Sequence, residues 1–109
     1  MADDQEHRLA ANEAVFRKIN EAIESGKTPA EPGSLAAFRC ECARLGCNDL
    51  IELTFGEYEH VRSHPRRFFV SPGHERPEIE TAVEIHPGYL VIEKRDEAGR
   101  AAERTDPRS

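Results

Sequence analysis

The stretch FRCECARLGC, residues 38–47, holds all three cysteines of this chain, Cys40, Cys42 and Cys47. Thiols this close together suit a metal site, a redox pair or small buried apolar side chains. In an extended segment alternate side chains point to one face, so Cys40 and Cys42 are expected to lie together. A turn through residues 44–46 then returns Cys47 to that face. We therefore expect three thiolates to converge in a geometry that suits zinc.

A disulfide is the weaker interpretation of the same stretch. A bond between Cys40 and Cys42 needs strained local geometry, and a bond to Cys47 leaves one thiol over. An odd number of cysteines and the lack of a signal-peptide pattern place the chain in the cytoplasm, where thiols stay reduced. A reactive thiol pair that responds to oxidants stays open as an alternative.

Composition bounds the size of the core. The chain has 109 residues, of which 38% are hydrophobic and 33% charged, so it predicts one small domain. A core of this size is marginal without a metal or a disulfide. The expected organisation is an amphipathic helix at 1–25, a linker at 26–34, a compact zinc-binding domain at 35–94 and a disordered tail at 95–109.

The N-terminal helix has an apolar stripe. Its residues recur at helical spacing: Leu9, Val15, Phe16, Ile19, Ala22 and Ile23. The stripe predicts a helix that lies on the domain, and a helix that binds a partner or a second copy is the alternative.

The compact region predicts the order β-β-α-β-β-β, and with the first helix this makes an α+β domain. LAAFRCEC leads through a turn into DLIELT, and Thr54 with Glu57 forms a capping box that starts a helix ended by Pro65. Strands are expected at 67–70, 80–85 and 89–94.

His74 is the expected fourth ligand. It follows the turn pair Pro72-Gly73, directly after the strand at 67–70. Cys40, Cys42, Cys47 and His74 make a tetrahedral Cys3His set for one Zn²⁺ per chain, with iron as the alternative metal. The net charge of such a site is near −1, and Arg39, Arg44 or backbone amides are expected to moderate it.

A finger-like set offers another choice of ligands. Cys42-x4-Cys47-x12-His60-x3-His64 has the spacing of a two-Cys, two-His zinc finger. The position three residues before His60 is Glu57, where such a finger requires an apolar side chain, and Cys40 is left out. We therefore do not expect a DNA-binding finger.

A catalytic zinc requires an open position for water. If His74 is not a ligand, the three cysteines leave such a position, with Glu41 or Glu75 as the base of a metal-dependent hydrolase. The sequence has no phosphate-binding glycine loop, nucleophile elbow or zinc-deaminase motif. We therefore do not expect an enzyme.

The charge balance bears on partners. The net charge is −6, so nucleic acid is not the expected ligand, and no stretch is apolar enough to span a membrane. The expected partner is another protein, bound through the N-terminal helix or the acidic surface, with a homodimer as the alternative.

The chain resembles a group of small bacterial proteins of no established function. The shared motifs are ANEAxFRxxNE (11–21), C-E-C-x4-C (40–47), EY-x-x-VR (57–62), F-x-V-x-PGHE (68–75) and GY-x-V-x-EK (88–94). The histidine of the PGH motif corresponds to His74, whereas His60 and His64 lie outside the pattern. The resemblance thus implies the Cys3His set, and it implies no activity.

Together these observations predict a small domain that is stabilised by a structural zinc and acts in protein interaction or regulation. We expect it to unfold when the metal is removed. The alternative function is a thiol-based regulator that responds to redox conditions or to metal.

Overall fold

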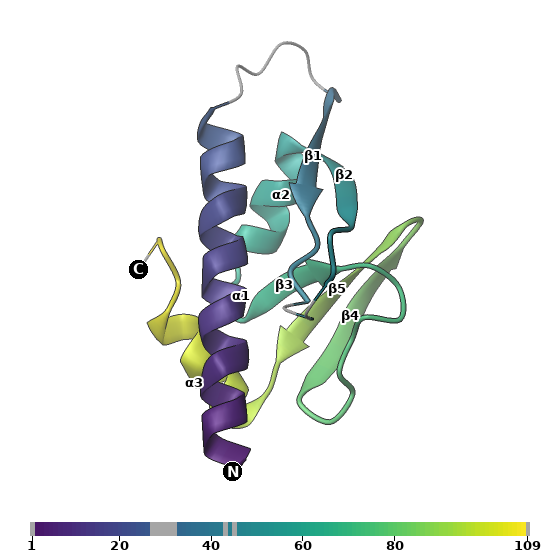
Figure 1. Cartoon of the computed structure of the whole chain (residues 1–109). Coiled ribbons are helices and arrows are strands. Elements are labelled where there is room, and N and C mark those ends of the chain that lie inside the picture. Colours follow the sequence, from purple (N-terminus) through teal and green to yellow (C-terminus); the bar gives the residue numbers. More distant parts are fainter. Residues whose placement is uncertain (1, 27–32, 43, 45, 109) are drawn as a thin grey trace.

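The computed structural model of the chain describes residues 2–26, 33–42, 44 and 46–108. Its elements follow in the order α1 (Ala2–Ser25), β1 (Leu35–Arg39), β2 (Leu50–Thr54), α2 (Phe55–Arg62), β3 (Arg67–Val70), β4 (Glu80–His86), β5 (Tyr89–Lys94) and α3 (Asp96–Arg104) (Figure 1). This order confirms the predicted α+β class and the predicted helix followed by β-β-α-β-β-β. Most of the predicted linker, residues 27–32, lies outside the described part of the chain.

The strands form two small antiparallel sheets. β1 pairs with β2, with Phe38 opposite Ile51, and β5 lies between β3 and β4 in the second sheet. The two sheets meet where the chain leaves β1, because the Glu41 amide donates to the Phe69 carbonyl on β3 over 3.0 Å. The cysteine stretch therefore bridges the two sheets.

Local sequence explains the ends of α2. The Thr54 hydroxyl accepts from the Glu57 amide over 3.0 Å, and the Glu57 carboxylate accepts from the Thr54 amide over 2.8 Å. This is the predicted capping box. α2 ends at Arg62, three residues before Pro65, which lacks the amide hydrogen that would continue a helix. The chain then turns directly into β3.

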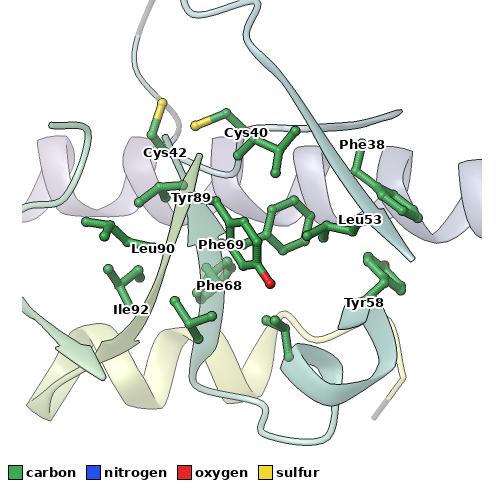
Figure 2. Packing of buried hydrophobic residues seen from close by; sticks show 14 of the residues in the cluster. Phe38, Cys40, Cys42, Leu53, Tyr58, Phe68, Phe69, Tyr89, Leu90 and Ile92 are labelled. Carbon is green, nitrogen blue, oxygen red and sulfur yellow. The ribbon is translucent and has the colours of Figure 1, made fainter. Parts of the chain in front are cut away.

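The core is built around three aromatic rings from both sheets and α2. Phe38 stacks on Tyr58 with ring centroids 4.5 Å apart, and Phe69 meets both rings edge-on at 6.2 and 6.0 Å. Burying each such side chain contributes about 1.5–3 kcal/mol. Figure 2 shows Cys40 and Cys42 at one end of this cluster, so the cysteine stretch lies at the edge of the core.

α1 contacts the domain through polar side chains, which corrects the stripe predicted from the sequence. Glu13, Arg17 and Asn20 are buried on one helix face, whereas Val15 is 53% exposed and Ala22 is also exposed. Burial of these polar and charged side chains is tolerated because each has partners in the domain. The helix does lie on the domain, as predicted, but on a face that hydrophobic periodicity does not reveal.

The remaining stripe residues lie between these extremes. Phe16, Ile19 and Ile23 are half-buried, and Ile23 packs against the core. Leu9 lies outside the residues whose side chains the structure describes. Within the described chain, no helix combines the length and the apolar character needed to cross a membrane.

The predicted disordered tail at 95–109 is wrong, because α3 occupies Asp96–Arg104. Acidic residues in its first turn and Arg104 in its last suit the helix dipole. Ala102 is buried, and its carbonyl accepts from the Arg17 guanidinium over 3.2 Å. The Arg62 guanidinium of α2 donates to the Asp106 carboxylate, so charged residues from α1 and α2 hold a segment whose composition alone indicates disorder.

Candidate metal centre

Two of the three cysteines follow directly from the end of β1. Cys40 and Cys42 are buried, and the Cys40 amide donates to the Asp49 carbonyl over 3.0 Å, which holds the two arms of the cysteine loop together. The chain then turns back, with the Cys47 amide donating to the Arg44 carbonyl over 3.1 Å. Gly46 has a φ of +81°, a conformation that favours glycine, so the turn that returns Cys47 depends on it.

His74 reaches the same place from the end of β3. Its amide donates to the Ser71 carbonyl over 3.0 Å, which closes a turn whose Gly73 has a φ of +90°. The Arg44 guanidinium donates to the Gly73 carbonyl over 3.1 Å, so the cysteine loop and the histidine turn are tied directly to each other.

The four predicted ligands converge. One ligand atom from each of Cys40, Cys42, Cys47 and His74 lies within 4.8 Å of all the others. His74 Nδ1 lies 3.6 Å from the sulfur of Cys40 and 3.6 Å from that of Cys47. Sulfur and nitrogen bound tetrahedrally to one Zn²⁺ at about 2.3 and 2.0–2.1 Å are separated by about 3.6 Å. The arrangement therefore fits a tetrahedral ion.

The electrostatics of the thiols favour a cation. Burial raises the pKa of Cys40, and it raises the pKa of Cys42 to about 12. Thiols in such surroundings stay protonated unless a positive charge lies beside them, and a bound Zn²⁺ deprotonates its cysteine ligands outright. Free thiolates are therefore disfavoured at Cys40 and Cys42, and a bound cation would offset the cost of deprotonating them.

Backbone amides support two of the sulfurs, as predicted. The Ser71 amide donates to the Cys40 sulfur over 3.2 Å, and the Arg44 amide donates to that of Cys42 over 3.4 Å. Hydrogen bonds of this kind spread the negative charge of three thiolates. The Arg44 side chain contributes differently from the prediction, because it donates to a carbonyl beside His74.

Asp49 is a member of the site that the sequence analysis missed. His74 directs Nδ1 at the sulfurs, so its Nε2 faces outward, where an Asp49 carboxylate oxygen lies 3.8 Å away. Metal-bound histidines commonly direct the second ring nitrogen at a carboxylate. Asp49 comes two residues after Cys47 and directly before β2, and this closeness in sequence could have indicated that it lies beside the site.

The carboxylate of Glu41 does not belong to the cysteine face. It is 1% exposed and accepts hydrogen bonds from the Asn20 side chain over 2.8 Å and the Phe69 amide over 3.4 Å. Burial raises the pKa of Glu41 to about 7. Its engagement with α1 and β3 removes it as the base of a hydrolytic zinc.

The histidines of the finger-like set are used elsewhere. His60 is on α2 and lies 2.7 Å from the Glu84 carboxylate of β4, and His64 is exposed beyond the end of that helix. Neither belongs to the group of potential metal ligands among the described residues. The finger-like spacing is therefore a coincidence of the sequence.

No protein-family model, curated protein or solved structure matches the chain. The resemblance described above therefore stays a prediction, and the function must be inferred from the site itself.

Proposed function

We propose that this chain is a small zinc-binding protein whose one Zn²⁺, bound by Cys40, Cys42, Cys47 and His74, holds the fold together, and that it acts in protein interaction or regulation. The observation that carries the proposal is the equal 3.6 Å separation of His74 Nδ1 from two cysteine sulfurs. Three soft thiolates and one imidazole favour Zn²⁺ over magnesium or calcium, which prefer oxygen ligands.

The position of the site supports a structural metal. The cysteines follow β1 and the histidine follows β3, so one ion joins the two sheets. Four protein ligands close the tetrahedron and leave no position for a reactive water, which argues against a hydrolase. Binding energy at such a site is also folding energy, because the ligands converge only in the folded chain.

The interaction role rests on apolar groups that the fold leaves uncovered. Val15 on α1 is 53% exposed, and Ile85 on the edge strand β4 is 81% exposed. The chain carries a net charge of −6, so a protein partner with a basic surface is favoured over nucleic acid.

Elemental analysis of protein purified without added metal tests the zinc site. We expect about one zinc per chain, lost in Cys47→Ser and His74→Ala and retained in the matched control His60→Ala. Metal far below one equivalent in a folded chain overturns the proposal. A brown protein that contains iron would show that the bound metal is iron and not zinc. A chelator is expected to unfold the compact region.

A redox-responsive regulator is the second candidate, favoured by the partial exposure of Cys47 beside two buried cysteines. The Cys47 thiolate would attack a peroxide, forming a sulfenic acid as hydroxide or alkoxide leaves. A second thiolate would then displace hydroxide to form a disulfide, and zinc would be released. Parallel measurement of free thiols and released zinc under mild peroxide tests it, and a site that keeps its zinc rules it out.

A further inference from the structure

The segment of Cys40, Glu41 and Cys42 has two functional faces. The sulfurs of the two cysteines belong to the metal centre, whereas the intervening Glu41 side chain is buried against α1 and β3. Alternation along an extended backbone produces this division. A shift of the Glu41 backbone would therefore move the two neighbouring thiols.

Asn20 of α1 binds this segment on both sides of Cys40. Its Oδ1 accepts from the Arg39 amide over 2.8 Å, and its Nδ2 donates to the Arg39 carbonyl over 3.0 Å. The same Nδ2 donates to the Glu41 carboxylate over 2.8 Å. One fully buried side chain of the helix thus fixes the residue before and the residue after the first ligand.

The bonds that Asn20 makes have no substitute from solvent. Asn20 is fully buried and Glu41 is 1% exposed, so losing either partner leaves the other with an unsatisfied polar group. On its other side the segment is held by β3 and the residue after it, through the Phe69 carbonyl and the Ser71 amide. The ligand loop is therefore held between α1 and β3.

From this geometry we infer that Asn20 and Glu41 are positioning residues of the metal centre, and that docking of α1 and binding of zinc strengthen each other. The inference rests on the proposed zinc site. Coupling between two binding events is reciprocal, so bound zinc must strengthen the docking of α1 by the same factor by which docked α1 strengthens zinc binding. A partner that binds the docking face of α1 would thereby lower the zinc affinity, and loss of zinc would weaken the docking of α1 on the domain.

The test compares zinc affinities by competition with a chromophoric chelator. Asn20→Ala is expected to bind zinc about 10–100-fold more weakly than the wild-type protein, as for other residues that orient ligands. Lys18→Ala, on the exposed face of the same helix, is expected to leave the affinity unchanged. Glu41→Gln keeps the size of the side chain and one acceptor, and we expect it to fall between the two.

Glu13→Gln controls for a general loss of stability. Glu13 is buried on the same face of α1, seven residues before Asn20, and its partner is Lys94 of β5 and not the cysteine segment. We expect Asn20→Ala to lower the zinc affinity at least about tenfold more than Glu13→Gln does. Far-UV circular dichroism of the zinc-loaded proteins checks that each variant is folded. If Asn20→Ala does not fold, the zinc affinity of Glu41→Gln is compared with that of Glu13→Gln instead.

The outcomes separate this inference from the proposed function. Wild-type protein that binds no zinc overturns the metal site itself. Zinc bound equally well by wild type, Asn20→Ala and Glu41→Gln overturns only the coupling, as does an equal loss in Asn20→Ala and Glu13→Gln.

Discussion

The guanidinium carbon of Arg17 lies 3.8 Å from the centre of the Phe68 ring, and no part of the Arg17 side chain is exposed. The same guanidinium donates to the carbonyls of Pro65, Arg67 and Ala102, which belong to two parts of the chain distant from α1 in sequence. A single arginine of α1 thus joins the helix to β3 and to α3. Arg17 is therefore expected to be the main polar anchor of the N-terminal helix.

Replacing Arg17 tests that role. Arg17→Ala leaves three carbonyls without their donor, and we expect it to lower the free energy of unfolding by about 3–5 kcal/mol. Lys18→Ala, one residue away on the exposed face, is expected to change it by less than about 0.5 kcal/mol. Urea unfolding of the zinc-loaded proteins measures both. Similar stabilities for the two variants would show that the anchor is unimportant.

Asp106 is expected to contribute stability that depends on pH. Burial alone would raise its pKa, but hydrogen bonds from the Arg108 amide and the Arg62 guanidinium lower the pKa below the ordinary value of 3.8. A depressed pKa stabilises the fold above the unfolded value, and this stabilisation is lost as the pH falls through the folded value.

We therefore expect Asp106→Asn to lower the free energy of unfolding by about 1–3 kcal/mol near neutral pH, with the difference from wild type shrinking as the pH falls below about 4 and vanishing only below the folded pKa of Asp106. Urea unfolding of both proteins over a pH series measures this difference. Glu78→Gln, at an exposed position, serves as the control. A difference that stays constant with pH would contradict the account.

Hydrophobic and capping patterns predicted most of the fold because they depend on neighbours in sequence. The capping box of Thr54 and Glu57 satisfies backbone groups within one turn, so its residues identify it directly. The convergence of the four candidate ligands was also predictable, since Cys40 and Cys42 alternate on one segment and the Pro72-Gly73 turn directs His74 towards them.

Long-range polar contacts explain what the sequence did not reveal. Arg17 and Asn20 look like solvent-facing residues of an amphipathic helix, yet their partners are 48 to 85 and 19 to 21 residues away, respectively. α3 was missed for a related reason, because the C-terminal segment is held by Arg17 on the Ala102 carbonyl and by Arg62 on Asp106. Periodicity arguments assume that buried faces are apolar, and this chain departs from that assumption.

Asp49 is expected to raise the zinc affinity of the site by orienting His74. A carboxylate 3.8 Å from the outward ring nitrogen favours the tautomer that leaves Nδ1 free to bind zinc. Asp49→Ala should weaken zinc binding about 10-fold or more, and Asp49→Asn, which retains an oxygen acceptor, should weaken it less. Glu52→Ala, exposed on β2, provides the control in the same chelator competition. An unchanged affinity in Asp49→Ala would remove this residue from the site.

X-ray absorption at the zinc edge tests the central claim most directly, because it counts the sulfur and nitrogen ligands around the metal. The Cys40, Cys42, Cys47 and His74 site predicts three sulfurs at about 2.3 Å and one nitrogen at about 2.0–2.1 Å. Two sulfurs with two nitrogens, or a sulfur shell with an oxygen from water in the wild-type protein, would contradict it.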